Sequence, residues 1–225
     1  MREAEGQLLP VYLLADESGS MDEYVGNLNA GMRSLHMALL REPMAAAKIR
    51  FSVLGFANSV TERLALADLR DEAELPRLSA YGGTNYEAAF DDLRTRIPRD
   101  VRTLKAQGYR VHRPAVFFLS DGLPNNGGDW REAHRRLTDR AQTPAAPNIV
   151  SFGIGSVDAA TVLAVATGPD YAYVSVPGAD LGNCIAGFFS SLTKSVVESG
   201  NSMVAGAPTL TVAPPEGFVM AIDEV

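Results

Sequence analysis

The sequence predicts an α/β fold in three layers: a doubly wound, mostly parallel sheet with helices on both faces and one antiparallel strand at an edge. Two short runs, Pro10–Ala15 (PVYLLA) and Ala115–Leu119 (AVFFL), are wholly apolar and lead directly to acidic residues. Such runs are typical of strands that are buried on both faces. Segments with helical apolar periodicity alternate with the strands, and right-handed crossovers then place helices on both faces of a parallel sheet.

The first half of the chain supplies a helix and two more strands. The helix ends before Pro43, and its apolar stripe comprises Val25, Leu28, Met32, Leu35 and Leu39. Ile49–Phe56 is the next predicted strand. Val60–Leu66 follows after a short interruption at Asn58, which predicts a hairpin and therefore an antiparallel strand at an edge of the sheet.

The second half continues the alternation. A helix is expected to start at Thr84 and to end at Pro98, because proline cannot donate a helical hydrogen bond. Asp129 is expected to cap a helix that runs to about Arg140. The remaining elements are a strand at Asn148–Gly153, a short helix at Thr161–Ala166, a last strand at Tyr171–Val176, and a long helix with one face formed by Leu181, Ile185, Phe188, Phe189, Leu192 and Val196.

The chain divides into one domain, residues 1–199, and an extended tail, residues 200–225. The tail contains three prolines and has no helical periodicity. Thr209–Ala213 (TLTVA) has the β-branched content of a strand, so the tail is expected either to be disordered or to dock as a strand.

Composition excludes several classes of function. The chain has 225 residues and a formal net charge of -7, which argues against nucleic acid as a partner because phosphate binding needs clustered Lys and Arg. The single cysteine, Cys184, cannot form an internal disulfide and is expected to be a small buried side chain. The first residues do not read as a secretory leader, and no apolar run approaches the roughly 20 residues of a membrane-spanning helix. We therefore expect a cytoplasmic protein without direct membrane insertion.

Five oxygen-bearing side chains are candidates for a metal site. Asp16 and Asp121 each follow a buried strand, at the sheet edge where ligands of open parallel sheets bind. Ser18 and Ser20 follow Asp16 at steps of two in the loop DESGS, and Thr84 comes after two glycines in YGGTNYEAAF. Carboxylates and hydroxyls are hard oxygen ligands that suit Mg²⁺ best, with Mn²⁺ or Ca²⁺ as alternatives, and one coordination position would remain for a ligand from outside.

The same residues also have ordinary structural interpretations. Ser and Asp often cap helices and turns, so DESGS alone is compatible with a solvated turn, and an acid after a core strand can cap a turn. Glu17, Asp22 and Glu23 add negative charge beside the site, either as outer-shell ligands of the metal or, as we expect, as a solvated helix start that the helix dipole favours. The spacing and order of the three motifs together favour the metal site.

Asp-x-Ser-x-Ser after the first strand, Thr after Gly-Gly, and Ser-Asp-Gly after a buried strand resemble the metal-ion-dependent adhesion site (MIDAS) of von Willebrand factor A (vWA) domains. The five family positions fall on the five residues named above, in the family's order. The resemblance extends from about Gln7 to Ser199 and implies the Rossmann-like vWA fold. It further implies that the Asp or Glu of a protein partner completes the coordination of the metal.

Two longer stretches, GGTNYEAAFDDL and SDGLPNNGGDWREA, resemble bacterial tellurium-resistance proteins of the TerY kind. That resemblance implies a bacterial stress or tellurite-resistance signalling system with a protein kinase and a metal-dependent phosphatase as partners. Where such proteins often have Thr-Asp, this chain has Asn125 and Asn126, so contacts at that point need not carry over.

The site loops lack residues that two other functions require. A metal-dependent phosphatase of the haloacid-dehalogenase type needs a second acid two residues after Asp16, where this chain has Ser18, and no lysine lies in the site loops. A phosphate-binding P-loop and a dinucleotide-binding glycine motif are both missing from the sequence. We therefore expect a binding protein and not an enzyme. The alternative to a signalling module is a vWA scaffold or chaperone-like subunit that partners an AAA+ ATPase.

Overall fold

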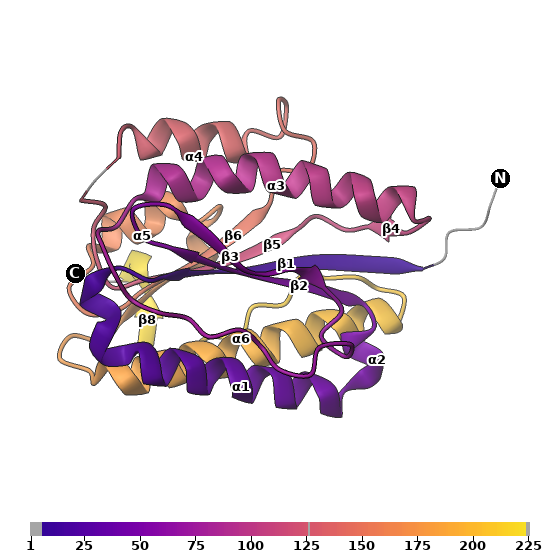
Figure 1. Ribbon diagram of the computed structural model, residues 1–225, viewed down its shortest axis with the longest axis horizontal. Coiled ribbons are helices and arrows are strands. Elements are labelled where there is room, and N and C mark those ends of the chain that lie inside the picture. Colours follow the sequence, from indigo (N-terminus) through magenta and orange to yellow (C-terminus); the bar gives the residue numbers. More distant parts are fainter. Residues whose placement is uncertain (1–5, 126, 224–225) are drawn as a thin grey trace.

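The computed structural model describes residues 6–125 and 127–223, and it has the expected three-layer α/β architecture. In Figure 1 a central sheet separates two layers of helices. One layer holds α1 (Val25–Arg41), α2 (Pro43–Ala46) and α6 (Leu181–Val204). The other holds α3 (Tyr86–Ala106) and α4 (Trp130–Thr138), while α5 (Ala159–Val165) packs on β6 and β7.

The strands of the described residues form one sheet in the order β3-β2-β1-β5-β6-β7-β8, with β4 paired to β1. Their bounds are β1 Gln7–Asp16, β2 Ile49–Phe56, β3 Val60–Ala67, β4 Arg110–Val111, β5 Ala115–Ser120, β6 Asn148–Gly153, β7 Ala172–Ser175 and β8 Phe218–Met220. The central strands pair in parallel. β3 is antiparallel to β2, as expected, and β8 adds a second antiparallel edge that the sequence did not predict.

β1 lies at the centre of the molecule, between β2 and β5, and its residues from Leu8 to Asp16 are all buried. Alternate side chains of this strand enter two separate cores, because side chains of a strand point to opposite faces. Leu13 belongs to the core beneath α1 and α6, and Leu14 to the core beneath α3 and α4. Burial on both faces explains the unbroken apolar run. Packing on both faces also holds the end of β1, where Asp16 lies, in a defined position.

The sequence predicts that this helix ends at Pro98, and that prediction is wrong. The helix α3 continues to Ala106 with Pro98 inside it. Proline removes one helical hydrogen bond, which costs about 3 kcal/mol. The apolar stripe nevertheless continues beyond it through Val101 and Leu104, both buried. Burying two such side chains contributes roughly 1.5–3 kcal/mol each, which offsets the loss.

The start of α3 also differs from the expectation. Asn85 caps the helix, with its side-chain oxygen accepting from the backbone N–H of Ala88 at 3.0 Å, and helical residues begin at Tyr86. Thr84 therefore lies just outside the helix. At α4 the expected cap is confirmed, because Asp129 accepts from the N–H of Glu132 at 3.1 Å, although that helix ends at Thr138.

The expected division at residue 199 falls within α6, which runs on to Val204. The chain then turns back, and Thr209–Ala213 lies along α6 without forming a strand. Its backbone N–H groups donate to serine hydroxyls of the helix: Thr209 to Ser202, Thr211 to Ser199 and Ala213 to Ser195, at 2.9–3.0 Å. Further on, β8 joins the sheet edge. The tail thus docks on the domain through three serines of α6. The spacing of these serines along the helix did not lead us to predict the contact.

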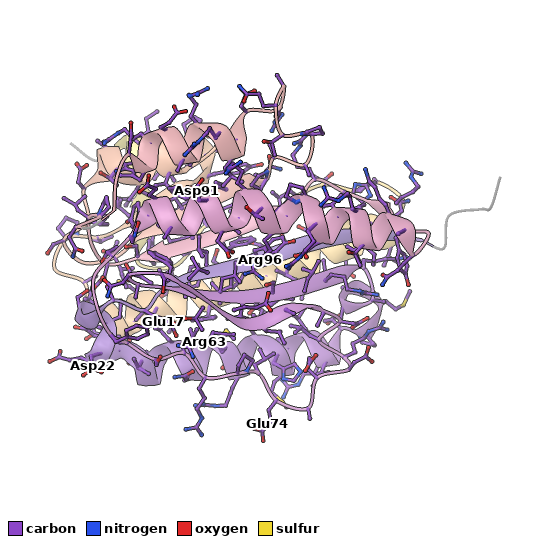
Figure 2. All side chains as sticks on the ribbon, turned by 45° about the horizontal axis from the view of Figure 1, so that its top comes forward. Glu17, Asp22, Arg63, Glu74, Asp91 and Arg96 are labelled. Carbon is purple, nitrogen blue, oxygen red and sulfur yellow. The ribbon has the colours of Figure 1, made fainter. Side chains whose placement is uncertain are left out.

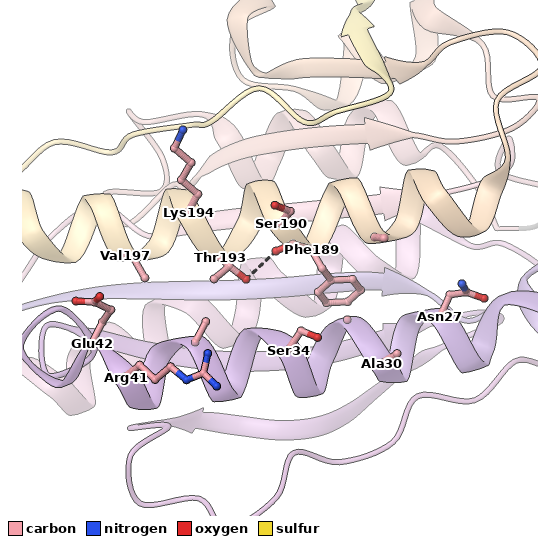
Figure 3. A pocket seen from close by; sticks show the side chains of 13 residues that line it. Asn27, Ala30, Ser34, Arg41, Glu42, Phe189, Ser190, Thr193, Lys194 and Val197 are labelled. Carbon is pink, nitrogen blue, oxygen red and sulfur yellow. Dashed lines mark hydrogen bonds between the residues drawn. The ribbon is translucent and has the colours of Figure 1, made fainter.

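The helices α1 and α6 pack side by side, and the contact depends on Gly31. A Cβ atom there would lie 2.0 Å from the ring of Phe189, so only glycine lets the ring lie against α1. A groove of about 670 Å³ lies beside this contact, and many of the side chains that line it are small. Figure 3 shows it between the two helices, with Ala30, Ser34 and Thr193 among the residues along it. Within the described residues, no helix has the length and apolar character needed to cross a membrane.

Candidate metal centre

Asp16 is the last residue of β1, and its carboxylate is held at both oxygens. Oδ1 accepts from the backbone N–H of Ser18 at 2.8 Å, which closes the turn after the strand. Oδ2 accepts from the hydroxyl of Ser120, the last residue of the neighbouring β5, at 2.5 Å. The side chain is fully buried. Two adjacent parallel strands therefore fix this carboxylate at their carboxyl ends.

The hydroxyls of DESGS reach the third loop. Ser18 Oγ and Ser20 Oγ are 3.1 Å apart, and Ser20 Oγ donates to Asp121 Oδ1 at 2.9 Å. Ser18 is buried, Asp121 is half-buried and Ser20 is exposed. Four of the five predicted side chains, those of Asp16, Ser18, Ser20 and Asp121, thus form one cluster that runs from the interior to the surface.

Thr84 is joined to the same place through backbone contacts. Gly19 N–H donates to the carbonyl of Gly82 at 2.9 Å, which ties the first loop to the turn before Thr84. Asn125 binds Thr84 reciprocally: its side-chain oxygen accepts from the Thr84 N–H at 2.9 Å, and its own N–H donates to the Thr84 carbonyl at 3.0 Å. The hydrogen bonds therefore connect all three loops.

Gly82 shows why this turn needs glycine. Its φ of +75° lies in the left-handed region that side chains disfavour, and a Cβ there would meet Nδ2 of Asn58 at 2.6 Å. Asn58 Oδ1 in turn accepts from the N–H of Gly83 at 2.9 Å. The expectation that two glycines permit a close approach of the backbone is confirmed at this position.

The charge of Asp16 is poorly stabilised by the protein alone. Burial raises the pKa of its carboxyl to about 6, and the nearby charge of Asp121 acts in the same direction. Hydrogen bonds from Ser120 and Ser18 oppose that shift and do not cancel it. Burial also raises the pKa of Asp121. Raised pKa values mean that the ionised forms of these two neighbouring carboxylates are unfavourable. A bound divalent cation would stabilise those ionised forms.

Other buried acids of the molecule are neutralised by arginine. In the part of the chain that the structure describes, Asp16, Glu17 and Asp68 are the buried acidic residues. Glu17 and Asp68 pair with arginines at 2.7–3.0 Å, namely Arg63 for the first and Arg50 and Arg70 for the second. Asp16 forms no ion pair within the same described residues. Of these three buried acids, Asp16 is therefore the one whose negative charge has no cationic side chain beside it.

Glu17 is not the solvated residue that the sequence analysis expected. It is 1% exposed, and its carboxylate accepts from Arg63 Nη2 at 2.9 Å and from the backbone N–H of Ser79 at 2.7 Å. Figure 2 shows Glu17 and Arg63 facing one another, with Asp22 pointing away. The expectation holds only for Asp22 and Glu23, which are exposed.

Gly55 provides the space that Glu17 occupies. A Cβ atom at this position of β2 would lie 1.9 Å from Glu17 Oε2. Arg63 also donates to Ser79 Oγ at 2.6 Å, so the buried carboxylate connects β2, β3 and the segment that leads to Thr84. Glu17 thus anchors the first metal loop between Asp16 and Ser18.

The third loop rests on a group of aromatic rings. The hydroxyl of Tyr86 donates to the carbonyl of Gly122 at 2.8 Å, one residue after Asp121. The Tyr86 ring makes edge contacts with Phe56, Phe118 and Trp130. The first residue of α3 therefore positions the loop that carries Asp121. Asn126, which was also singled out in the sequence, lies outside the described residues.

The arrangement fits a hard divalent cation. The donor set is two carboxylates and hydroxyls, without histidine or thiol, and such oxygen sets suit Mg²⁺. No group of three or more His, Cys, Asp or Glu side chains with metal-binding geometry occurs among the described residues, so any cation here would rely on the hydroxyls too. The partial exposure of Asp121 and Ser20 leaves the site open to an external ligand.

No known family model and no curated protein sequence matches this chain. Solved structures do. A pilus adhesin, SpaC from Lactobacillus rhamnosus GG, matches with a TM-score of 0.66 and 12% identity over 88% of this chain and 31% of its own. A von Willebrand factor type A protein from Catenulispora acidiphila matches with a TM-score of 0.56 and 17% identity over 85% and 43%.

Proximal thread matrix protein 1 from the mussel byssus, solved with a zinc-occupied MIDAS motif, matches with a TM-score of 0.51 and 18% identity over 90% of this chain and 46% of its own. The chain thus spans less than half the length of these proteins. Identities this low establish the architecture alone. The protein has a vWA-type fold.

Proposed function

We propose that the protein is a non-enzymatic, metal-dependent protein-binding module. In this proposal Asp16, Ser18, Ser20, Thr84 and Asp121 hold one Mg²⁺, and the carboxylate of a partner protein completes its coordination. The observation that carries the proposal is the burial of Asp16 beside Asp121 without a cationic side chain. The zinc-occupied MIDAS motif of the mussel protein, on the same fold, is in agreement with it.

Each residue has a separate task. Asp16 supplies a buried negative charge whose orientation Ser18 and Ser120 fix. Ser18 and Ser20 offer neutral hydroxyl oxygens, so they add no negative charge to that of the two carboxylates and leave the cation able to accept a further anionic ligand. Asp121, near the surface, and Thr84, held by Asn125, complete the donor set. A bound Mg²⁺ would supply a positive charge at the surface that a partner's Asp or Glu can reach.

We further propose a cytoplasmic setting in a bacterial stress or tellurite-resistance signalling system, with a protein kinase or a metal-dependent phosphatase as the partner. Support for this finer statement comes from the stretches GGTNYEAAFDDL and SDGLPNNGGDWREA. Nucleic-acid binding is not part of the proposal, because the net charge is -7. Direct membrane insertion is not part of it either, because no apolar run of the sequence approaches the roughly 20 residues of a membrane-spanning helix.

A metal-dependent pull-down from native bacterial lysate tests the proposal. The immobilised protein should retain a kinase or phosphatase in Mg²⁺ and release it in EDTA, since the partner carboxylate binds through the cation. The Asp121→Ala variant should retain neither, while Asp22→Ala, which removes an exposed acid outside the cluster, should behave as wild type.

If the EDTA eluate contains an AAA+ ATPase instead, the result supports the scaffold role over the signalling role. The proposal of metal-dependent binding would still hold. Retention of the same proteins by Asp121→Ala, or in EDTA, would contradict the binding mechanism itself.

A further inference from the structure

A second cavity, of about 560 Å³, lies away from the metal centre. It is enclosed by the second half of α3, by residues 111–114, which lead into β5, and by the loop 142–145. β5 starts at Ala115, next to the cavity, and ends at Ser120, next to Asp121. The two features therefore lie at opposite ends of the same strand; in Figure 1 the cavity end is marked by β4 and the end of α3.

The lining of this cavity is strongly basic. It includes Arg94, Arg102, Lys105, His112 and Arg113, and none of the described residues that line it is acidic. The protein as a whole carries seven more acidic than basic residues, 27 against 20. The basic residues around this cavity indicate a positive local electrostatic potential, although the net charge of the protein is negative.

Most of these cations lack a carboxylate partner. Arg94 pairs with Asp91 at 3.2 Å. Among the described residues, Arg102, Lys105 and Arg113 form no ion pair within 4.0 Å, whereas arginines elsewhere on α3, such as Arg96, do. Three unneutralised cations therefore border the same space.

Arg113 is the best-fixed member of the group. It is half-buried, and its Nη1 donates to the carbonyl of Ala146 at 2.5 Å, which holds the guanidinium at the base of the loop 142–145. Burial and the positive charge of Arg140 lower its pKa. Burial and the charge of Arg110 likewise lower the pKa of His112. The nearby charges of Arg110 and Arg140 thus add to the positive potential at this end of the cavity, and a bound anion would offset it.

The rest of the lining is mostly apolar, with two polar side chains, Gln142 and Thr143, beside Pro98, Val101, Val111, Pro114, Pro144 and Ala145. A volume of this size matches small-molecule sites, which combine apolar walls with a few charged groups that fix orientation. Guanidinium groups bind phosphate in a bidentate manner, and an ammonium adds a point charge.

We propose that this cavity binds a small phosphorylated molecule with an apolar or aromatic body. Arg113, Arg102 and Lys105 contact the phosphate, and the proline and valine side chains contact the body. The site is independent of the metal centre and does not rest on the function proposed above.

Titration of the full-length protein with phenyl phosphate, followed by NMR amide shifts in EDTA, tests this site. We expect saturable shifts at residues 111–113 and at Gln142, Thr143 and Ala145, with inorganic phosphate and benzoate each binding more weakly because each lacks part of the recognised chemistry. Arg113→Gln should weaken binding roughly tenfold or more, since it removes a charge-assisted contact. Lys105→Gln, on the exposed face of α3, should weaken binding without affecting the fold.

Arg135→Gln is the matched control, because Arg135 is exposed on α4 and pairs with Glu132 outside the cavity. It should bind as wild type, and so should Asp121→Ala, which alters only the metal centre. The proposal is overturned if phenyl phosphate produces no saturable shifts at the cavity, or if Arg113→Gln and Lys105→Gln both bind it with wild-type affinity.

Discussion

The Asp16→Asn variant should be more stable than the wild type without metal and should lose all stabilisation by Mg²⁺. Burial raises the pKa of Asp16 from 3.8 to about 6, so its charged form opposes folding at neutral pH by up to about 3 kcal/mol. Asparagine has the same shape and no charge. For a protein of this size, each kcal/mol gained raises the unfolding midpoint by roughly 2–4 °C.

The gain should depend on pH in one direction. Because the pKa is raised in the folded state, the difference between variant and wild type is full above the folded pKa of about 6, declines as the pH falls, and disappears below the unfolded value of 3.8, where Asp16 is protonated in both folded and unfolded chains. Thermal unfolding in EDTA and in Mg²⁺ at pH 7.5 and pH 4.5 measures both effects. Asp22→Asn removes an exposed acid and should show neither. A variant that is destabilised in EDTA, or still stabilised by Mg²⁺, would refute this interpretation of Asp16.

Glu17→Gln should destabilise the protein by about 2–3 kcal/mol and weaken Mg²⁺ binding. The carboxylate is 1% exposed and binds Arg63, whose own side chain is 22% exposed. Breaking a buried ion pair by changing one partner typically costs about 3–5 kcal/mol, and the partial exposure of Arg63 reduces that figure. The first metal loop loses its anchor to Ser79 and Arg63, so Asp16 and Ser18 are held less firmly.

Chemical denaturation measures the stability, and calorimetry with Mg²⁺ measures the affinity. Glu23→Gln makes the same chemical change at an exposed position of the short 3-10 helix Gly19–Tyr24 and should alter neither quantity by a measurable amount. Equal unfolding free energies for the two variants would show that the Glu17 pair contributes nothing net. Unchanged Mg²⁺ affinity in Glu17→Gln would remove its positioning role.

The sequence was sufficient for the architecture because burial on both faces leaves a simple signature. The apolar runs at Pro10–Ala15 and Ala115–Leu119 are found in the adjacent central strands β1 and β5. The sequence was not sufficient where tertiary packing outweighs a local preference, such as the tendency of proline to end a helix. Pro98 stays inside α3 because Val101 and Leu104 continue the buried stripe. The three-residue strand β8 is too short for a period-2 pattern to be recognised.

The candidate site was predictable to the extent that it follows from strand ends. Asp16 and Asp121 sit where two adjacent parallel strands stop, and the hydroxyls of Ser18 and Ser20 bridge them. The burial of Glu17 was missed because its partner Arg63 lies 46 residues away. A signal did exist: Gly55 lies inside the predicted strand Ile49–Phe56, and a glycine inside a strand often marks the close approach of another group.

The supporting contacts of Ser120 and Asn125 were missed for a related reason. Ser120 precedes the acidic residue of the third motif and was read only as part of Ser-Asp-Gly, yet it donates to Asp16. Asn125 was noted only as a departure from the TerY pattern, and it binds the backbone of Thr84 at both of its polar groups. Such contacts depend on loop geometry that no spacing in the sequence specifies.

The account depends most directly on one cation among the five oxygen-bearing side chains. Anomalous diffraction from crystals grown with Mn²⁺, which stands in for Mg²⁺, tests it. We expect a single strong peak within direct or water-bridged reach of Asp16, Ser18, Ser20, Thr84 and Asp121, and its disappearance in Asp121→Ala crystals. Crystals that show no peak there, or a peak elsewhere while Ser20 still donates to Asp121, would contradict the account.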